Sequence, residues 1–260
     1  MMARTKRDIQ NTLGTNPTFK SNNYTYSGSH RKPGGTSTLL MRRFYSPRNK
    51  TWTDPASIIQ RTRIVNEEYK ISIINAYHPR HRTGPSGSFY QTLNTIRMTE
   101  KWAASVDVED YFYSTIIDKI KEDVRLGYKV VLGGDFNCDN SEDGEMTKRL
   151  RAQNLINITS PPGTTTPTTY KRGRKTLDHI WITPDLSAHV TKFGYLPYDL
   201  GFDSDHRGMF VDLRCTGTKV PNLTKKRRRK LKSKHPKNAN LYLKQVHKSA
   251  KAHNIEARIA

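Results

Sequence analysis

The chain has 260 residues, of which 34% are hydrophobic and 9% aromatic, enough to build one large domain or two small ones. It contains no apolar run near the roughly 20 residues that span a membrane, and its N-terminus lacks the apolar stretch of a signal peptide, which argues against a membrane or secreted protein. Its cysteines are Cys138 and Cys215; they could pair, but so sparse a set is typical of a reducing, intracellular compartment.

Charge is the strongest compositional signal. Lys and Arg number 45 against 23 Asp and Glu, a net charge of +22. Residues 219–260 carry 14 Lys/Arg and a single acidic residue, Glu256, a net +13, so that residues 1–218 carry the remaining +9. A basic balance on both parts favours a polyanionic partner, nucleic acid ahead of an anionic membrane. The alternative is an enzyme for a neutral substrate that bears a solvated basic tail.

The N-terminal part of the chain predicts a polar segment followed by strands. Residues 1–35 are polar and end in the turn sequence Arg31–Gly35, so we expect loop and a short helix there but no strand. β-Branched and large apolar residues predict a strand at Thr36–Phe44. Ile64–Val65 and Tyr69–Ala76 predict a hairpin, whose second strand becomes a continuous apolar run, typical of a buried strand.

The middle of the chain predicts alternating helices and strands. Apolar spacing predicts helices at about Phe89–Trp102 and Val108–Arg125, the second with one apolar face. A turn at Gly127 leads into a strand that begins at Lys129–Leu132, and this order of helix, short turn and strand indicates an α/β fold. The remaining predicted elements are a short helix at Met146–Leu155 and strands at Thr176–Ile182 and Met209–Leu213.

Polar residues follow directly on the strand Val130–Gly134. Asp135 and Asn137 stand at the carboxyl end of a buried strand, where α/β folds place their chemistry, and side chains two apart on a strand point to the same side. A carboxylate and a carboxamide in this arrangement can act on one water or one metal ion. The alternative is an ordinary exit from strand to turn, since Gly, Asp and Asn also favour turns.

Two further polar clusters come later in the chain. Asp178 lies inside a predicted strand, where an unpaired carboxylate is costly to bury, so we expect a cationic or hydrogen-bond-donating partner such as a histidine. Ser204, Asp205 and His206 combine a capping hydroxyl, a hard oxygen ligand and an imidazole that can bind developing negative charge. The alternative is a helix N-cap at Ser204 with an incidental histidine.

Together these clusters resemble the endonuclease/exonuclease/phosphatase superfamily, which includes apurinic/apyrimidinic endonucleases and pancreatic-type deoxyribonuclease. The resemblance runs from about Thr36 to Leu213. It rests on four segments in the family's order, each at a predicted strand end: Asn75–Pro79, Gly134–Asn137, Leu177–Ile180 and Ser204–His206. Within the superfamily, Lys32–Thr36 and Gly194–Pro197 make the chain most similar to the endonuclease domain of non-LTR retrotransposons, which is joined to a reverse transcriptase.

The resemblance implies a four-layer α/β sandwich of two mixed sheets flanked by helices, followed by a basic C-terminal tail. It divides the chain into a polar N-terminal segment at residues 1–35, the superfamily domain at residues 36–216 and a basic linker at residues 217–260.

The family also carries an Asn on its first strand and a metal-binding Glu on the next, both upstream of the Lys-Pro-Gly-Gly region. Only 31 residues precede Lys32 here, and Glu67 and Glu68 do not match the motif. We therefore expect the chain to be truncated at its N-terminus, without the family's first strands and without a principal metal ligand.

The resemblance also assigns roles to residues. Asp135 orients or deprotonates the attacking water and Asn137 positions it. His206, held by Asp178, stabilises the pentacovalent phosphate, and Tyr77 donates to the phosphate or packs the site. The implied metal is Mg²⁺, with Mn²⁺ as a substitute, and its implied ligands are Asp135, Asn137, Asp205 and His206.

Basic residues add two candidate contacts to nucleic acid. Arg172, Arg174 and Lys175 form a turn just before Asp178 and are expected to lie near the scissile phosphate. The run Lys225–Lys230 matches a nuclear-import signal and would also bind phosphate backbones without sequence preference. The alternative is that this run is a solubilising linker.

The resulting prediction is Mg²⁺-dependent hydrolysis of DNA phosphodiester bonds by an intracellular, nuclear protein, impaired by loss of the N-terminal metal ligand. Two alternatives stay open: a non-catalytic basic nucleic-acid binder, and a phosphatase of the same superfamily that acts on inositol phosphates or phospholipid head groups. The positive charge on both parts of the chain favours nucleic acid over these small substrates. His78, His81 and His179 have no ligand spacing, and we interpret them as structural or surface residues.

Overall fold

The computed structural model describes residues 18–22, 36–40, 48–65, 69–80, 88–99, 107–139, 144–161, 164–198, 204–214 and 244. The chain divides into two compact units, Met1–Gly217 and Thr218–Ala260, and the strands and helices below all belong to the first. Within the described ranges, none of the helices combines the length and the apolar character that crossing a membrane requires.

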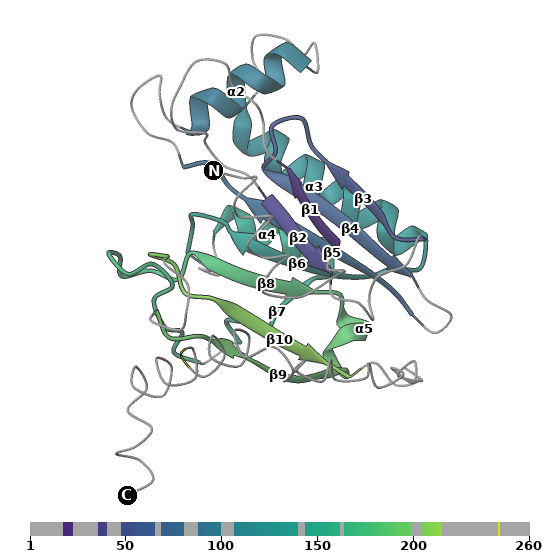
Figure 1. Ribbon diagram of the computed structural model, residues 1–260, viewed down its shortest axis with the longest axis vertical. Helices are drawn as coiled ribbons and strands as arrows, with labels where there is room; N and C mark the ends of the chain where they lie inside the picture. Colours follow the sequence, from purple (N-terminus) through teal and green to yellow (C-terminus); the bar gives the residue numbers. More distant parts are fainter. Residues whose placement is uncertain are drawn as a thin grey trace, which may run out of the picture. The chain divides into compact units, whose positions relative to one another are not determined.

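The centre of the first unit is a six-stranded mixed sheet (Figure 1). In spatial order its strands are β3 (Lys50–Thr53), β4 (Ile59–Val65), β5 (Lys70–Tyr77), β6 (Lys129–Asp135), β8 (Asp178–Ile182) and β7 (Ile156–Asn157). β5 and β6 run parallel, whereas every other neighbouring pair in this sheet is antiparallel. β5 and β6 therefore end at the same edge of the sheet, and β8 begins there.

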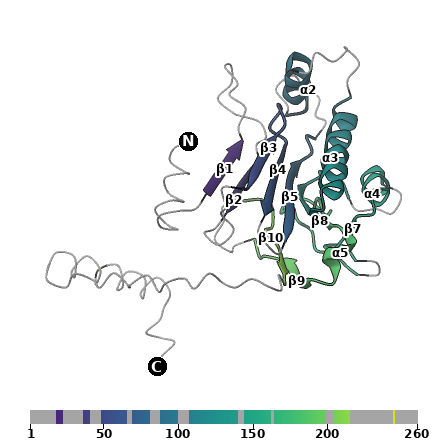
Figure 2. The same ribbon diagram turned by 90° about the vertical axis from the view of Figure 1, so that its right-hand side faces the viewer.

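Two antiparallel hairpins accompany the large sheet: β1 (Thr18–Asn22) with β2 (Thr36–Leu40), and β9 (Val190–Tyr195) with β10 (Met209–Leu213). β2 is bonded to the large sheet, because Thr38 Oγ1 donates to Gln60 Oε1 of β4 at 2.7 Å and Asn75 Nδ2 of β5 donates to Thr38 Oγ1 at 2.8 Å. Figure 2 shows this hairpin on one side of the large sheet and helix α3 (Val108–Arg125) on the other. The large sheet is thus covered on both faces.

The helices are α2 (Ser88–Thr99), α3, α4 (Glu145–Arg151) and α5 (Pro184–Ser187). α3 begins where the Asp107 side chain accepts a hydrogen bond from Glu109 N, and it ends before Gly127, whose φ of 76° suits glycine. Its largest buried aliphatic and aromatic side chains recur at helical spacing and join the core: Phe112, Ile116 and Ile120. Burying a side chain of this size contributes about 1.5–3 kcal/mol, so this face fixes α3 on the sheet.

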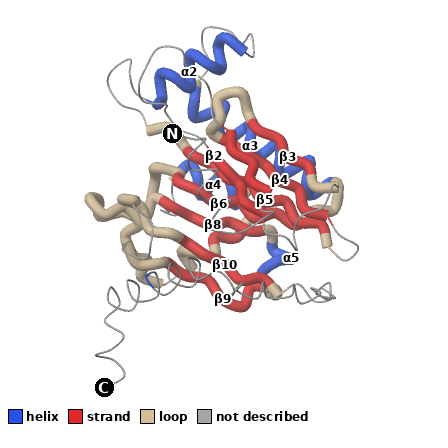
Figure 3. Tube along the Cα trace, in the orientation of Figure 1, coloured by secondary structure: helices blue, strands red, loops and turns tan. Residues whose placement is uncertain are grey.

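Strand β8 is buried on both faces. Trp181 joins the main core cluster, which also contains Leu132 of β6 and the apolar face of α3. Ile180 and Ile182 instead join a smaller cluster that reaches β9 and β10. Alternate residues of a strand point to opposite faces, so this strand separates two apolar clusters. The chain enters β8 and β10 through loops, drawn tan in Figure 3.

The predicted α/β architecture of sheets flanked by helices is confirmed; of the two predicted mixed sheets, the large one is mixed, whereas the smaller sheets are two-stranded and antiparallel. The predicted bounds of Val108–Arg125 and Met209–Leu213 match α3 and β10. The expectation of no strand in residues 1–35 was wrong, because the polar sequence of β1 forms a strand by pairing with β2. Strands β3, β7 and β9 and helix α5 were not predicted. The predicted turn at Arg31–Gly35 lies outside the described residues.

Candidate active site

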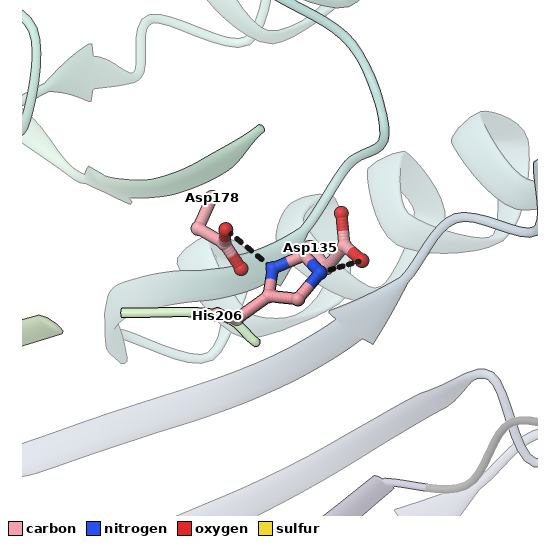
Figure 4. Close-up of side chains that lie close together, drawn as sticks. All are labelled: Asp135, Asp178 and His206. Carbon is pink, nitrogen blue, oxygen red and sulfur yellow. Dashed lines mark hydrogen bonds and ion pairs between the residues drawn. The ribbon is translucent and has the colours of Figure 1, made fainter. Parts of the chain in front are cut away.

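Asp135, Asp178 and His206 lie together at the edge of the large sheet where β6 ends and β8 begins (Figure 4). Asp135 is the last residue of β6, Asp178 is the first of β8, and the two are register partners across this antiparallel pair. Directly opposed residues project to the same side of a sheet, so both carboxylates face His206. One ligand atom from each of the three side chains lies within 4.8 Å of the others.

The backbone before Asp135 can take its path only with glycine. Gly134 has a φ of 155°, and a Cβ built on it would lie 1.8 Å from the carbonyl oxygen of Ala76 on β5. The neighbouring Gly133 has room, since its Cβ would meet nothing closer than Ile180 Cγ1 at 3.7 Å. The close approach at Gly134 brings β6 against β5, where Tyr77 is the register partner of Asp135.

Asn137 folds back on Asp135. Its φ of 50° is a left-handed conformation that Asn tolerates, and its backbone N–H donates to Asp135 Oδ1 at 2.9 Å. Its side-chain Nδ2 donates to the His78 carbonyl oxygen at 2.7 Å and lies 3.4 Å from Asp135 Oδ2. The sequence left open whether Asp135 and Asn137 form a polar site or only a turn at the end of the strand. In the structure the two residues form the turn and also bond to each other.

His206 connects the two carboxylates. Its Nδ1 is 2.8 Å from Asp178 Oδ2, and its Nε2 is 3.9 Å from Asp135 Oδ2. The expected donor partner of Asp178 is thus present. Ser204 Oγ accepts a hydrogen bond from His206 N at 3.0 Å, and residues 204–208 contain no helix, so the alternative of a helix N-cap at Ser204 was wrong. The side chains of Asp178 and Asp135 are only 11% and 17% exposed.

Burial and charge shift the proton affinities of this group. Burial, reinforced by the neighbouring Asp178 carboxylate, raises the pKa of Asp135 to about 6, against the opposing hydrogen bond from Asn137 N–H. The hydrogen bond with Asp178 raises the pKa of His206 above its ordinary value. The site therefore combines a carboxylate that accepts a proton near neutral pH with an imidazole that retains one.

Only two of the four predicted metal ligands lie in the group of three at the sheet edge. Asp135 and His206 belong to the group of three, and Asp178, predicted only to hold His206, joins them. Asp205 lies outside that group, and its carboxylate accepts a hydrogen bond from Arg172 Nη2 at 2.8 Å. Asn137 directs its amide group to protein acceptors.

The basic turn before β8 is docked on the segment that carries His206. Lys171 N donates to the Asp205 carbonyl oxygen, and Arg207 N donates to the Thr169 carbonyl oxygen, both at 2.8 Å. These bonds frame a β-bridge between Tyr170 and His206, whose rings lie 5.1 Å apart. The pattern of the sequence gave no signal for Thr169 or Tyr170, because they lie in a Pro/Thr-rich loop.

The predicted nucleic-acid contacts of this turn are open to solvent. The side chain of Arg172 is 73% exposed despite its bond to Asp205, and that of Lys175 is 68% exposed, 3.9 Å from Asp139. Arg174 lies between them and is exposed as well. The run Lys225–Lys230 lies outside the described residues.

His78 and His179, which the sequence suggested to be structural or surface residues, pack against the protein interior. His179 is fully buried, with Nε2 at 3.1 Å from the Cys138 carbonyl oxygen. His78 packs edge-on against Phe112, and burial lowers its pKa to about 4. Both agree with the interpretation that they are not ligands. His81 lies outside the described residues.

The donor set fits a divalent cation. Asp135 and Asp178 offer carboxylate oxygens and His206 offers an imidazole nitrogen, within the spacing that one ion spans. A cation would also offset the burial and repulsion that disfavour the charged form of Asp135.

Comparisons with solved structures found the same fold. The 3′ phosphatase NExo from Neisseria, bound to a product DNA hairpin, is 14% identical, with a TM-score of 0.53, over 80% of this chain and 82% of that one. The 3′-5′ exonuclease NExo from Neisseria meningitidis is 15% identical, with a TM-score of 0.50, over 75% of this chain and 79% of that one. The endonuclease domain of TRAS1, a telomere-specific non-LTR retrotransposon, is 16% identical, with a TM-score of 0.46, over 76% of this chain and 79% of that one.

A comparison with curated proteins found no match. A comparison with protein families matched residues 5–206, most of the chain and all of the residues grouped at the sheet edge, to one family. With the sheet, the paired Asp178 and His206 and the adjoining Asp135 in place, the chain belongs to the Endonuclease/Exonuclease/phosphatase family.

Proposed function

We propose that this chain hydrolyses phosphodiester bonds in DNA with the help of a divalent metal, as the endonuclease domain of a non-LTR retroelement. Family membership supports nuclease or phosphatase chemistry. The observation that carries the proposal is the line of Asp178, His206 and Asp135 at a sheet edge, in which His206 is hydrogen-bonded to Asp178 at 2.8 Å and lies at an ion-pair distance of 3.9 Å from Asp135. This arrangement supplies a proton acceptor and a positively charged donor side by side.

In the proposed reaction, Asp135 orients a water molecule and takes its proton as the water oxygen bonds to phosphorus. A carboxylate with a pKa of about 6 is ionised at neutral pH yet basic enough to accept that proton. Asn137 fixes the carboxylate through its backbone N–H. Asn137 thereby holds the acceptor in place, and its side chain borders the position of the water.

His206 stabilises the negative charge that develops on the phosphate. Because Nδ1 bonds to Asp178, Nε2 is the ring nitrogen directed at the space beside Asp135. An imidazolium there donates to a phosphate oxygen while the bond between phosphorus and the leaving oxygen breaks. Tyr77, the register partner of Asp135, is placed to donate to the same phosphate or to pack the site.

The metal we propose is Mg²⁺, with Mn²⁺ as a substitute. Asp135 and Asp178 are the side chains that would hold it while His206 carries its proton, neutral His206 would be a third ligand, and Asp205 would join after release from Arg172. When bound, the ion supplies a positive charge that polarises a phosphoryl oxygen.

DNA is the substrate that the charge distribution favours. Arg172 and Lys175 expose their charges beside the site, and the 42-residue basic segment from residue 219 adds a net +13. The NExo structure bound to a DNA hairpin supports DNA by analogy of fold. The run Lys225–Lys230 supports nuclear import.

Nicking of supercoiled plasmid DNA tests this function. We expect the wild-type protein to nick with Mg²⁺ and the Asp135→Ala variant to be inactive. Asp118→Ala is the matched control, since Asp118 is an exposed carboxylate on α3 and should leave nicking unchanged.

Three outcomes would contradict or redirect the proposal. No nicking at any level of Mg²⁺ or Mn²⁺ refutes the endonuclease. DNA binding that weakens steeply with salt and survives His206→Ala, without cleavage, supports the non-catalytic binder. Release of phosphate from inositol phosphates without DNA cleavage supports the phosphatase.

A further inference from the structure

Thr169 has no part in the proposed reaction, yet it stands where the Asp178 and His206 segments meet. The residue is fully buried. A buried hydroxyl is retained in a fold where its hydrogen bonds are made, because an unpaired one is costly. Its side-chain hydroxyl bonds to one of the two catalytic segments and its carbonyl oxygen bonds to the other.

The hydroxyl of Thr169 holds the start of β8. Leu177 N donates to Thr169 Oγ1 at 2.8 Å, and Asp178 N donates to the same oxygen at 3.1 Å. A threonine oxygen has two lone pairs and accepts both bonds at once. The backbone from which the Asp178 carboxylate projects is therefore fixed by this single side chain.

The carbonyl group of Thr169 holds the other segment. It accepts a hydrogen bond from Arg207 N at 2.8 Å, next to the β-bridge between Tyr170 and His206. The bonds flank this bridge rather than join its two residues, an arrangement in which opposed side chains approach most closely. The Tyr170 ring consequently packs against the His206 ring, at 5.1 Å between centroids.

We propose that Thr169 is a positioning residue that joins the two segments and so keeps His206 Nδ1 at 2.8 Å from Asp178 Oδ2. Its hydroxyl sets the carboxylate and its carbonyl sets the imidazole. A catalytic group that is displaced by about 0.5–1 Å from its productive position lowers the rate of reaction strongly. The catalytic consequence rests on the proposed endonuclease function, whereas the geometric one does not.

The test compares Thr169→Val, which keeps the shape and removes the acceptor, with Thr169→Ser, which keeps the acceptor. Thr166→Val is the matched control: Thr166 lies in the same loop, and its hydroxyl bonds to Thr176 Oγ1 at 3.0 Å rather than to the backbone of Leu177 or Asp178. The first readout is the NMR signal of the His206 Nδ1–H proton, which reports the bond to Asp178. The second is the split between kcat and KM in plasmid nicking with Mg²⁺.

We expect Thr169→Val to lose the hydrogen-bonded Nδ1–H signal and to lower kcat about tenfold with little change in KM. Thr169→Ser and Thr166→Val should resemble the wild type in both readouts. A wild-type Nδ1–H signal in Thr169→Val overturns the proposal. If that variant does not fold, Thr169→Ser decides, and loss of its signal overturns the proposal while retention supports it. If the wild type does not nick DNA, the endonuclease function fails and the NMR comparison still decides the role of Thr169.

Discussion

The proton affinity of Asp135 is the residue-scale property on which the proposed chemistry depends. Two neighbours act on this carboxylate. Asp178 is its register partner on β8, and Asn137, two residues later in the chain, donates a backbone hydrogen bond to it. Because the site is largely buried, water screens the interactions between these charged groups only weakly. The site is therefore expected to respond to pH near neutrality.

The rate of nicking should be bell-shaped in pH. On the acid side, Asp135 gains a proton and can no longer accept one from water, so kcat should fall as pH drops. Bound Mg²⁺ favours the charged carboxylate and moves this fall to lower pH. His206 works in the opposite sense, because its raised pKa keeps it protonated to higher pH before its charge is lost. A pH profile of nicking from acid to alkaline buffer checks this. A rate that stays level down to the lowest pH at which the protein is folded would contradict the role of Asp135.

Gly134 shows how one residue limits the site. Gly134→Ala should lower the free energy of unfolding by about 3 kcal/mol, because the new Cβ would overlap the Ala76 carbonyl oxygen. Gly133→Ala is the control, with its Cβ at ordinary contact distance from Ile180, and should cost about 1 kcal/mol or less. Urea denaturation of both variants gives the comparison. Equal losses in the two variants would mean that the approach of β5 to β6 is not tight.

At the scale of elements, a buried ionic network fixes α3 on the large sheet. Asp123 of α3 has no exposed surface and accepts hydrogen bonds from Ser72 Oγ at 2.5 Å and Arg63 Nε at 2.6 Å. Arg61 Nη1 lies 2.7 Å from Glu122 and 3.3 Å from Asp123. These bonds join the C-terminal half of α3 to β4 and β5.

Removing the centre of this network should be costly. Asp123→Ala should lower the free energy of unfolding by about 3–5 kcal/mol, since it leaves the buried Arg63 with only the partly exposed Glu122 as an ion-pair partner. Asp118→Ala, on the exposed side of the same helix, should change it by less than about 0.5 kcal/mol. Thermal or urea unfolding measures both. A loss for Asp123→Ala no larger than the control's would show that Glu122 alone holds the arginines.

The elements also show what a sequence can predict. α3 was predicted to its last residue because an apolar face of five turns is a strong signal, and β10 because Met209, Phe210 and Val211 form a short apolar run. β1 and β9 carry Lys and polar residues with little alternation, so their strand form depends on the partners β2 and β10. Local sequence does not contain that information.

The residues of the candidate site also fall into those that local sequence predicted and those that it did not. Asp135 was found because a carboxylate at the end of an apolar strand is unusual, and Asp178 because an unpaired carboxylate inside a strand is costly to bury. His206 was found because it follows an acidic residue in a family pattern. Thr169 and Tyr170 were missed because their importance comes from a bridge to a residue far along the chain. The bond between Asp205 and Arg172 was missed for the same reason.

At the scale of the whole molecule, charge is divided between the superfamily domain and the basic segment after it. If Lys225–Lys230 binds phosphates, replacing its six basic residues with Gln should reduce the slope of log affinity against log salt by about 5, at 0.9 per phosphate contact. Fluorescence anisotropy with a DNA duplex at several salt concentrations measures the slope. Replacement of the same number of uncharged residues, 238–243, with Gln is the control. An unchanged slope would mean that residues 225–230 do not touch DNA.

The pairing of Asp135 with Asp178 in register has a consequence for the inheritance of this site. Side chains alternate along a strand, so a shift of one residue between β6 and β8 would turn Asp178 away from His206 and toward the opposite apolar cluster. A single-codon deletion within residues 129–135 would therefore erase the centre in one step. Many point substitutions elsewhere would leave it intact. In diverging copies of such a gene, a change in the length of β6 or β8 would therefore remove the centre more readily than a point substitution elsewhere would.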